Sequence, residues 1–306
     1  MEKTQLYDMV IIGGGPAGAT AAIYAARAGL ASVILEQMNI GGEIVVTDRL
    51  DNYPGFPEGI AGAEFGLLLQ QQLESLDVPV ELAQVESLSL KGEVKEIISS
   101  AEAYKGKTIL IATGTEPNLL GVEGEIELRG RGVSYCATCD AAFFRGKTIG
   151  VVGGGDAALE ETIFLSRFVE KVYLIHRRDE FRGCSWLQEK VLKLPNAEVL
   201  WNTTVSKIEG EGKVTALQIR QDGRDRRLEA SGIFIYTGRM PKTGFLEGAE
   251  LEQDERGFIV TNAKMETSVE GVYAAGDIRK KYLRQVVTAA SDGAVAATAA
   301  AQYIYA

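Results

Sequence analysis

Two cysteines separated by two residues, Cys136 and Cys139, have the clearest potential for chemistry in this chain. They lie in the string Ser134-Tyr135-Cys136-Ala137-Thr138-Cys139-Asp140. A Cys-x-x-Cys turn brings two sulfur atoms within bonding reach, and such a pair can cycle between dithiol and disulfide. Asp140 could supply or remove a proton while one sulfur leaves, provided that burial favours its protonated form. An exposed aspartate without a role is the alternative.

A zinc site is a competing explanation for the same cysteines. Cys136, Cys139, Cys184 and His176 together supply a Cys₃His ligand set. The two outer ligands lack a recognisable knuckle spacing, so we predict no metal. Cys184 has no partner in the sequence pattern and is interpreted as an ordinary buried or inert thiol without a role.

A glycine-rich turn near the N-terminus predicts a nucleotide site. Gly13-Gly14-Gly15-Pro16-Ala17-Gly18 follows an apolar run and opens a helical stretch at 19–28. The glycines permit a tight turn, let a pyrophosphate approach the backbone, and allow close helix packing. Glu36 stands 23 positions after Gly13, at the end of a second apolar run, where a carboxylate would accept hydrogen bonds from a ribose diol.

The apolar run with its glycine-rich turn occurs twice in the chain. Residues 149–155 match residues 9–15 almost position for position. Each copy has an apolar run, glycines, a helical stretch (19–28 and 159–168) and a second apolar run. Each copy therefore predicts a βαβ unit. The second turn is Gly153-x-Gly155-x-x-Ala158.

Basic residues replace the acidic residue in the second copy. His176 lies 23 positions after Gly153, and Arg177 and Arg178 follow it directly. Guanidinium groups bind the 2′-phosphate of an NADP-type cofactor through paired charge-assisted hydrogen bonds. These arginines, with Arg182, predict selection of NADPH. The alternative is a solvated edge in which the arginines pair with the neighbouring acidic residues at 179 and 180.

Two Gly/Pro-punctuated segments, 113–117 and 236–241, each follow an apolar run and are interpreted as crossings between two domains. Residues 271–277 predict a strand that ends in a turn, and residues 284–303 a long Ala-rich helix. We expect this C-terminal part to return to the first domain.

Composition restricts the class of protein. The 306 residues, 46% of them hydrophobic, can form two domains of ordinary size. A net charge of −10 without a basic stretch makes nucleic acid an unexpected partner. The first six residues lack the apolar core of a signal peptide, and the apolar runs are too short to span a bilayer, so we expect no membrane segment. Three cysteines in such a chain favour the cytoplasm.

Together these motifs resemble the low-molecular-weight bacterial thioredoxin reductases, and the resemblance runs in register over essentially the whole chain. The strings that carry it are 13–18, Cys-Ala-Thr-Cys-Asp at 136–140, Gly-Gly-Gly-Asp at 153–156, His-Arg-Arg at 176–178, Gly276-Asp277 and Arg284-Gln285. The most specific is the cysteine string directly ahead of the second glycine-rich turn. The resemblance implies an α/β fold with two Rossmann-like domains. Residues 1–116 and 246–306 would form a discontinuous FAD-binding domain, and 117–245 an inserted NADPH-binding domain that carries the cysteine pair.

The resemblance also implies the residues that bind each cofactor. For FAD they are Gly13, Gly15, Pro16, Ala17, Gly18, Glu36, Gln37, Gly41, Gly42, Glu43, Asn52, Ala112, Thr113, Gly114, Gly276, Asp277, Arg284, Gln285 and Val286. For NADPH they are Gly153, Gly155, Asp156, Ala157, His176, Arg177, Arg178, Arg182 and Gly238. Two positions depart from the family pattern: Glu43 replaces a glutamine, and Arg239-Met240-Pro241-Lys242 replaces a Pro-Asn pattern.

The activity implied is the reduction of thioredoxin by NADPH through FAD and the cysteine pair. Cys139 would face the flavin and Cys136 would attack the partner disulfide. Rotation of the inserted domain through the two crossings would give both substrates access to the flavin. A homodimer is also implied.

Three alternatives stay open. The enzyme could serve a different disulfide partner, because the partner surface has no sequence signature. It could be a dithiol oxidase or use ferredoxin or NADH, although the arginine cluster argues for NADPH. A non-catalytic dinucleotide sensor is the third, but it would not need Cys136, Cys139 and Asp140 together.

Overall fold

The computed structural model describes residues 5–47, 50 and 52–306 of the chain. The chain forms two compact units: Met1–Glu116 with Met240–Ala306, and Pro117–Arg239. The chain returns to the first unit at Met240, six residues before the predicted boundary at 246, and Phe245 ahead of that boundary packs on the core of the first unit. Which cofactor each unit holds stays a prediction at this point.

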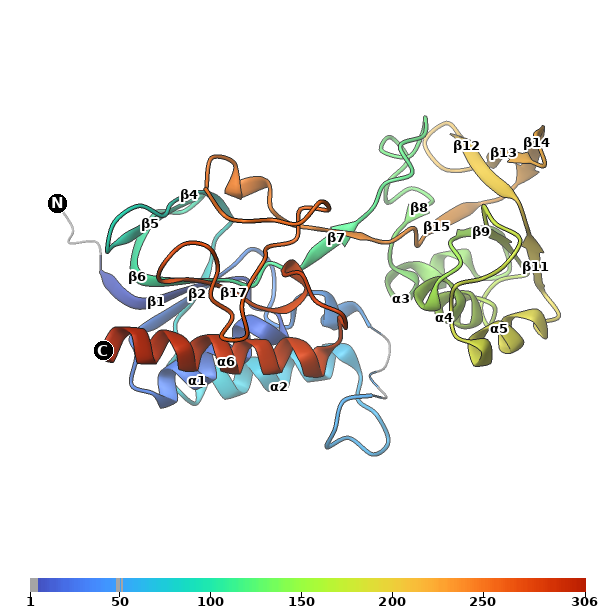
Figure 1. The fold of residues 1–306 in the computed structure, drawn as a ribbon. Helices are drawn as coiled ribbons and strands as arrows, with labels where there is room; N and C mark the ends of the chain where they lie inside the picture. The colour runs from blue at the N-terminus through green and yellow to red at the C-terminus, as the bar shows by residue number, and fades with distance from the viewer. Residues whose placement is uncertain (1–4, 48–49, 51) are drawn as a thin grey trace. The chain divides into compact units, whose positions relative to one another are not determined.

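The first unit is built on a seven-stranded sheet (Figure 1). Its parallel part has the order β3-β2-β1-β6-β17, and β5 and β4 extend it in antiparallel pairing. The strands are β1 (Leu6–Ile12), β2 (Ser32–Glu36), β3 (Val80–Leu82), β4 (Val85–Ser89), β5 (Lys95–Ser99), β6 (Ala103–Ile111) and β17 (Val272–Ala274). The predicted return of the C-terminal part is thus observed as the pairing of β17 with β6.

Helices cover one face of this sheet (Figure 1). They are α1 (Pro16–Arg27), α2 (Gly62–Glu74) and α6 (Val286–Tyr305). The unit also has the 3-10 turns η1 (Gly42–Val46), η3 (Gly244–Leu246) and η4 (Gly276–Ile278), and η3 and η4 contribute to the core on the face opposite these helices. In β1, Met9 and Ile11 face these helices, while Val10 and Ile12 face a second core on the opposite side. Alanines of α1 and α6 allow the two helices to pack closely.

The second unit repeats the design with a five-stranded parallel sheet of order β11-β10-β9-β15-β8. Its strands are β8 (Val133–Ser134), β9 (Thr148–Val152), β10 (Lys171–Ile175), β11 (Ala197–Leu200) and β15 (Gly232–Ile235). Its helices are α3 (Ala137–Asp140), α4 (Asp156–Leu165) and α5 (Ser185–Leu192), with the 3-10 turn η2 (Ala141–Phe144). An antiparallel sheet of β12 (Thr203–Glu209), β13 (Ala216–Gln221) and β14 (Arg224–Glu229) packs on one side of it.

The predicted crossings are the two segments at which the chain changes unit. They contain β7 (Thr115–Pro117) and β16 (Arg239–Pro241), which pair with each other in a two-stranded sheet. Gly114 and Gly238 flank this pair with positive φ angles of 68° and 113°, a conformation that favours glycine. Within the described residues, none of the helices has both the length and the apolar character that a membrane span requires.

Candidate active site

The first glycine-rich turn joins β1 to α1 with the close packing that its sequence predicts. Gly13 has a φ of 102°, and a side chain there would collide with the carbonyl oxygen of Ala112. A methyl group at Gly18 would lie 1.9 Å from the carbonyl oxygen of Gly13. By contrast, a methyl group at Gly15 would meet no atom within 4 Å. The side of the turn that packs on the protein, at Gly13 and Gly18, therefore has no free space, whereas the side at Gly15 is open. At this open side the first backbone N–H groups of α1 have no side-chain cap.

Glu36 ends β2 beside this turn. Its carboxylate accepts hydrogen bonds from the backbone N–H groups of Gly14 at 2.7 Å and Met38 at 2.9 Å. The carboxylate is thereby fixed next to the open turn, and each oxygen keeps a lone pair for a further donor. Gln37, the next residue, is exposed. This arrangement suits a ribose diol.

Gly41 and Gly42 bring a second segment to the same turn. The N–H of Gly41 donates to the carbonyl oxygen of Gly14 at 2.8 Å, and Gly42 faces the Cα of Gly15. Both have positive φ angles, 105° and 55°. A side chain at Gly42 would lie 3.3 Å from the Cα of Gly15, whereas one at Gly41 would collide with Val45. Glycine at 42 therefore keeps a cradle open beside Gly15, where the pyrophosphate is predicted. Glu43 is exposed at the start of η1.

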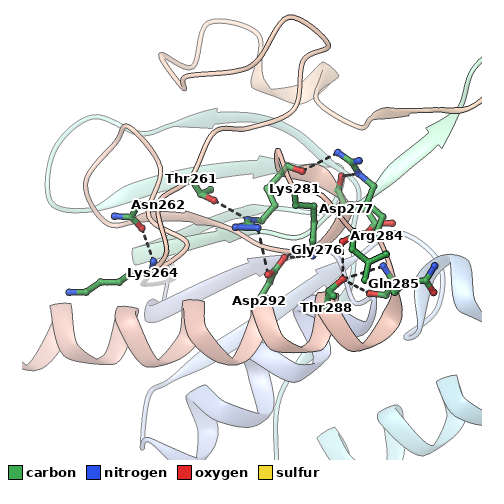
Figure 2. Close-up of polar contacts among 12 residues, drawn as sticks. Thr261, Asn262, Lys264, Gly276, Asp277, Lys281, Arg284, Gln285, Thr288 and Asp292 are labelled. Atoms are coloured by element: carbon green, nitrogen blue, oxygen red, sulfur yellow. Dashed lines mark hydrogen bonds and ion pairs between the residues drawn. The ribbon is translucent and has the colours of Figure 1, made fainter. Parts of the chain in front are cut away.

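The Gly276-Asp277 turn follows β17 and lies against the start of α1. A methyl group at Gly276 would lie 2.9 Å from the Cβ of Ala17. The N–H of Gly276 donates to the buried carboxylate of Asp292 in α6 at 3.1 Å. Lys281 also contacts Asp292 at 2.6 Å, and Arg279 lies 3.7 Å from it (Figure 2). The turn is thus fixed by a buried ionic cluster that the sequence analysis missed.

Arg284 lies between the Gly276-Asp277 turn and the loop that contains Phe258. Its guanidinium donates to the carbonyl oxygens of Asp277 and Arg279, both at 3.3 Å, and lies 4.0 Å from the ring centroid of Phe258. Burial lowers the pKa of Arg284, and the carboxylate of Asp277 partly opposes this effect.

Two predicted FAD residues meet although they are distant in sequence. Asn52 donates from Nδ2 to Oε1 of Gln285 at 3.0 Å. Gln285 caps α6 in a reciprocal box with Thr288, and Val286 begins the helix as a buried residue. Thr113 and Gly114 follow β6 beside the first glycine-rich turn, where a side chain at Gly13 would lie 3.1 Å from the Thr113 nitrogen, and the Thr113 hydroxyl donates to the carbonyl oxygen of Lys242. Thus the predicted FAD residues gather around the N-terminal end of α1 and its neighbouring segments.

The second glycine-rich turn joins β9 to α4 in the second unit. A side chain at Gly153 would lie 2.5 Å from the Cβ of Ala158, whereas one at Gly155 would meet no atom within 4 Å. Asp156 begins α4 and accepts a hydrogen bond from the N–H of Cys184 at 2.6 Å. Ala157 is exposed in the first turn of the helix. This turn also has a closed inner side and an open outer side.

His176 lies behind the second turn and supports it. The side chain is 4% exposed, and a methyl group at Gly154 would lie 2.2 Å from the imidazole ring. Nε2 of His176 is 2.9 Å from the carbonyl oxygen of Glu180. Burial lowers the pKa of His176, and the nearby guanidinium of Arg182 adds to this effect. The imidazole therefore holds the turn from within, whereas we predicted that it would contact the nucleotide.

The three arginines lie at the edge of this turn. Arg177, Arg178 and Arg182 are exposed, and among the described residues none of them forms an ion pair. The N–H of Arg182 donates to the carbonyl oxygen of Gly154 at 2.7 Å, which ties this segment to the turn. The alternative of an edge neutralised by Asp179 and Glu180 is therefore not what the structure shows.

Cys136 is disulfide-bonded and half-buried, and it directly precedes α3. The side chain of Cys139 lies outside what the structure describes. The Ser134 hydroxyl accepts a hydrogen bond from the backbone N–H of Cys136 at 3.1 Å and donates one to the carbonyl oxygen of Cys136 at 3.1 Å. Asp140 is half-buried at the end of α3. Cys184, the remaining cysteine, is free and exposed, so the expectation of a buried thiol is wrong.

Two tyrosines beside the cysteines were also missed by sequence reasoning. The hydroxyl of Tyr236 accepts the N–H of Ala137 at 2.9 Å. The hydroxyl of Tyr135 donates to the buried carboxylate of Glu125 at 2.6 Å. The same carboxylate also accepts hydrogen bonds from the backbone N–H groups of Leu120 and Gly121. No motif marks these residues, although the position of Tyr236 after a predicted strand was a usable signal.

The zinc alternative has no support from geometry. No group of three or more His, Cys, Asp or Glu side chains within the described residues is arranged to hold a metal ion. The Cys136 sulfur is engaged in a disulfide, and His176 faces a backbone carbonyl.

A two-domain α/β fold with two open glycine-rich turns and a disulfide beside one of them defines a dinucleotide-dependent disulfide oxidoreductase. The chain matches the family model for pyridine nucleotide-disulphide oxidoreductases over residues 7–293. It belongs to this family, which confirms the predicted family, the fold class, and the prediction of an enzyme that uses FAD and NADPH.

Individual relatives carry closely related names. The thioredoxin reductase of Treponema pallidum is 43% identical over 300 residues, which is 97% of each chain. The crystal structure of Lactococcus lactis thioredoxin reductase is 39% identical, covers 98% of this chain and 99% of its own, and has a TM-score of 0.93. A ferredoxin-flavin thioredoxin reductase from Clostridium acetobutylicum is 31% identical, with 98% of both chains covered and a TM-score of 0.54. The family thus includes relatives with another electron donor.

Proposed function

We propose that this chain is an NADPH-dependent thioredoxin reductase. The observation that carries the proposal is the disulfide-bonded Cys136, at the head of α3, in the same unit as a glycine-rich turn edged by unpaired arginines. Relatives named thioredoxin reductase, similar over nearly the whole chain, support thioredoxin as the partner. The arginines favour NADPH over NADH or ferredoxin as the electron source.

Each unit contains residues that suit one cofactor. In the first unit, Glu36, the cradle of Gly15 and Gly42, and the Gly276-Asp277 turn would hold FAD. In the second unit, the turn at Gly155 and the exposed arginines would hold NADPH. When bound, FAD would carry the two electrons from the nicotinamide to the cysteine disulfide.

The cysteine pair would carry out the exchange with the partner. The Cys136 thiolate attacks the partner disulfide, a new S–S bond forms, and one partner sulfur leaves as a thiol after taking a proton. Cys139 then attacks the Cys136 sulfur, which re-forms the Cys136–Cys139 disulfide and releases the second partner thiol. The partner gains two electrons and two protons, and Asp140, the residue after Cys139, would supply one of these protons.

We also infer a homodimer in the cytoplasm. The twofold oligomer is common among enzymes of this size, and α2 leaves Leu67 and Leu68 exposed on the first unit. The cysteine content supports a cytoplasmic location, because three cysteines, two of them in one Cys-x-x-Cys pair, do not form the disulfide framework of a secreted protein.

Single cysteine variants test the function. Reduction of a thioredoxin disulfide is followed by NADPH oxidation with wild type, Cys136→Ser, Cys139→Ser and, as the matched control, Cys184→Ser. We expect turnover only with wild type and Cys184→Ser. In Cys139→Ser the remaining Cys136 should trap thioredoxin as a mixed disulfide, visible by mass. Turnover in Cys136→Ser would refute the assignment.

A further inference from the structure

Tyr236 forms part of the floor of the second glycine-rich turn. It directly follows β15, and its N–H donates to the carbonyl oxygen of Val152, the last residue of β9, at 2.8 Å. The carbonyl oxygen of Tyr236 lies 2.6 Å from the position that a Cβ of Gly153 would occupy. The backbone of Tyr236 therefore lies in contact with the turn, which leaves room only for glycine at position 153.

The side chain of the same residue reaches the cysteine helix. Its hydroxyl accepts the N–H of Ala137, the first residue of α3 and the one that follows Cys136. Ala137 is 1% exposed, so water cannot easily replace this acceptor. Ser134 holds the N–H of Cys136 itself, and the two hydrogen bonds together fix the backbone on both sides of the Cys136 Cα.

The environment keeps the Tyr236 hydroxyl neutral. Burial raises its pKa far above the ordinary value for tyrosine, and the carboxylates of Glu161 in α4 and Asp140 in α3 raise it further. At neutral pH the group is a protonated hydroxyl with a lone pair available to Ala137. It acts neither as a base nor as a proton source.

We propose that Tyr236 is a positioning residue that fixes the cysteine helix α3 against the pyridine-nucleotide turn. The importance of this placement for turnover rests on the proposed function. The backbone of Tyr236 serves the nucleotide turn, whereas its hydroxyl serves only the cysteines. A change confined to the hydroxyl therefore separates the two halves of the reaction.

Tyr236→Phe removes the hydroxyl and keeps the ring and backbone. Tyr173→Phe is the matched control, because Tyr173 lies in β10 of the same unit and its side chain contacts Lys171 at a distance from the cysteine helix. Three quantities are measured on the FAD-loaded enzymes: the exchange rate of the Ala137 amide hydrogen, the rate at which NADPH bleaches the flavin absorbance, and the turnover of thioredoxin.

We expect the Ala137 amide in Tyr236→Phe to exchange about tenfold faster, as for the loss of one buried hydrogen bond. Thioredoxin turnover should fall by about tenfold or more, because small displacements of a reacting sulfur are costly. Bleaching by NADPH and the KM for NADPH should match the control. Unchanged Ala137 exchange, or an equal loss in both half-reactions, overturns the proposal. If wild type reduces no thioredoxin while Ala137 exchange still rises in Tyr236→Phe, the proposed function fails and the positioning role stands.

Discussion

At the scale of single residues, Arg177, Arg178 and Arg182 are charged groups without an ion-pair partner among the described residues. They lie beside a turn whose outer side is open at Gly155. Exposed guanidinium groups lose little solvation when a phosphate binds and can offer it two parallel hydrogen bonds. This placement makes the 2′-phosphate the feature by which the nucleotide is chosen.

Replacing Arg177 and Arg178 by Ala should therefore raise the KM for NADPH by about a hundredfold or more, since each of the two lost charge-assisted hydrogen bonds contributes roughly 1.5–3 kcal/mol. The KM for NADH should barely change. Arg224→Ala in β14, another exposed arginine of the same unit, is the control. Equal effects on both nucleotides would contradict the assignment.

His176 is the only histidine of the chain, so its titration can be separated from that of other groups. Burial lowers its pKa in the folded state below the ordinary value of about 6.5. Between these two pKa values the unfolded chain binds more protons than the folded one, so stability falls as the pH drops below about 6.5 and is insensitive to this group above it.

The prediction is that the urea midpoint of wild type falls more steeply between pH 7.5 and 5.5 than that of His176→Gln. The difference arises because protonation places a cation beside Gly154 and the guanidinium of Arg182. Parallel midpoint curves for the two proteins would show that His176 stays neutral, or titrates equally, in both states.

At the scale of elements, the sequence predicts the two βαβ units well because their signals are local. Apolar runs, glycine spacing and the residue at the end of the second strand all lie within about 30 residues of each other. The predicted helices at 19–28 and 159–168 appear as α1 and α4, which begin three residues earlier. The Asp292 cluster and the hydrogen bond from Ala137 to Tyr236 were missed, because each depends on contacts between distant segments that carry no spacing rule.

The open and closed positions of the second turn predict opposite outcomes for the same substitution. Gly155→Ala should fold normally and weaken NADPH binding, because the methyl group enters the space where the pyrophosphate is predicted. Gly154→Ala should lower stability by about 1–3 kcal/mol, because its methyl group collides with the His176 ring. Urea unfolding and NADPH titration measure the two effects, and similar losses of stability in both variants would be inconsistent with the geometry.

Asp292 connects α6 to the Gly276-Asp277 turn, so Asp292→Asn tests how that turn is held. The variant leaves the Lys281 cation buried beside a neutral side chain, which should destabilise the enzyme by about 3–5 kcal/mol and reduce FAD retention. Asp225→Asn, in an exposed pair with Arg220, is the control and should change neither quantity. Full FAD retention in Asp292→Asn would contradict the role.

At the scale of the whole molecule, the sequence predicted that the chain leaves the first unit and returns to it, and its punctuation at 113–117 and 236–241 located both crossings. The second boundary lies six residues before the predicted 246, because Phe245 also packs on the first core, a contact that the motifs used for the prediction do not encode. The chemistry divides in the same way: FAD residues are predicted in one unit, and NADPH residues with the cysteines in the other. Electrons must then pass from one unit to the other and back.

The most direct test of that path is an anaerobic titration of the yellow, FAD-loaded protein with NADPH and, separately, NADH. After each addition the flavin absorbance is recorded, and free thiols are counted after quenching in denaturant. The account predicts that NADPH bleaches the flavin, that two thiols appear in addition to that of Cys184, and that NADH is much less effective. If neither nucleotide bleaches the flavin, the second turn does not deliver electrons and the proposed reaction is wrong.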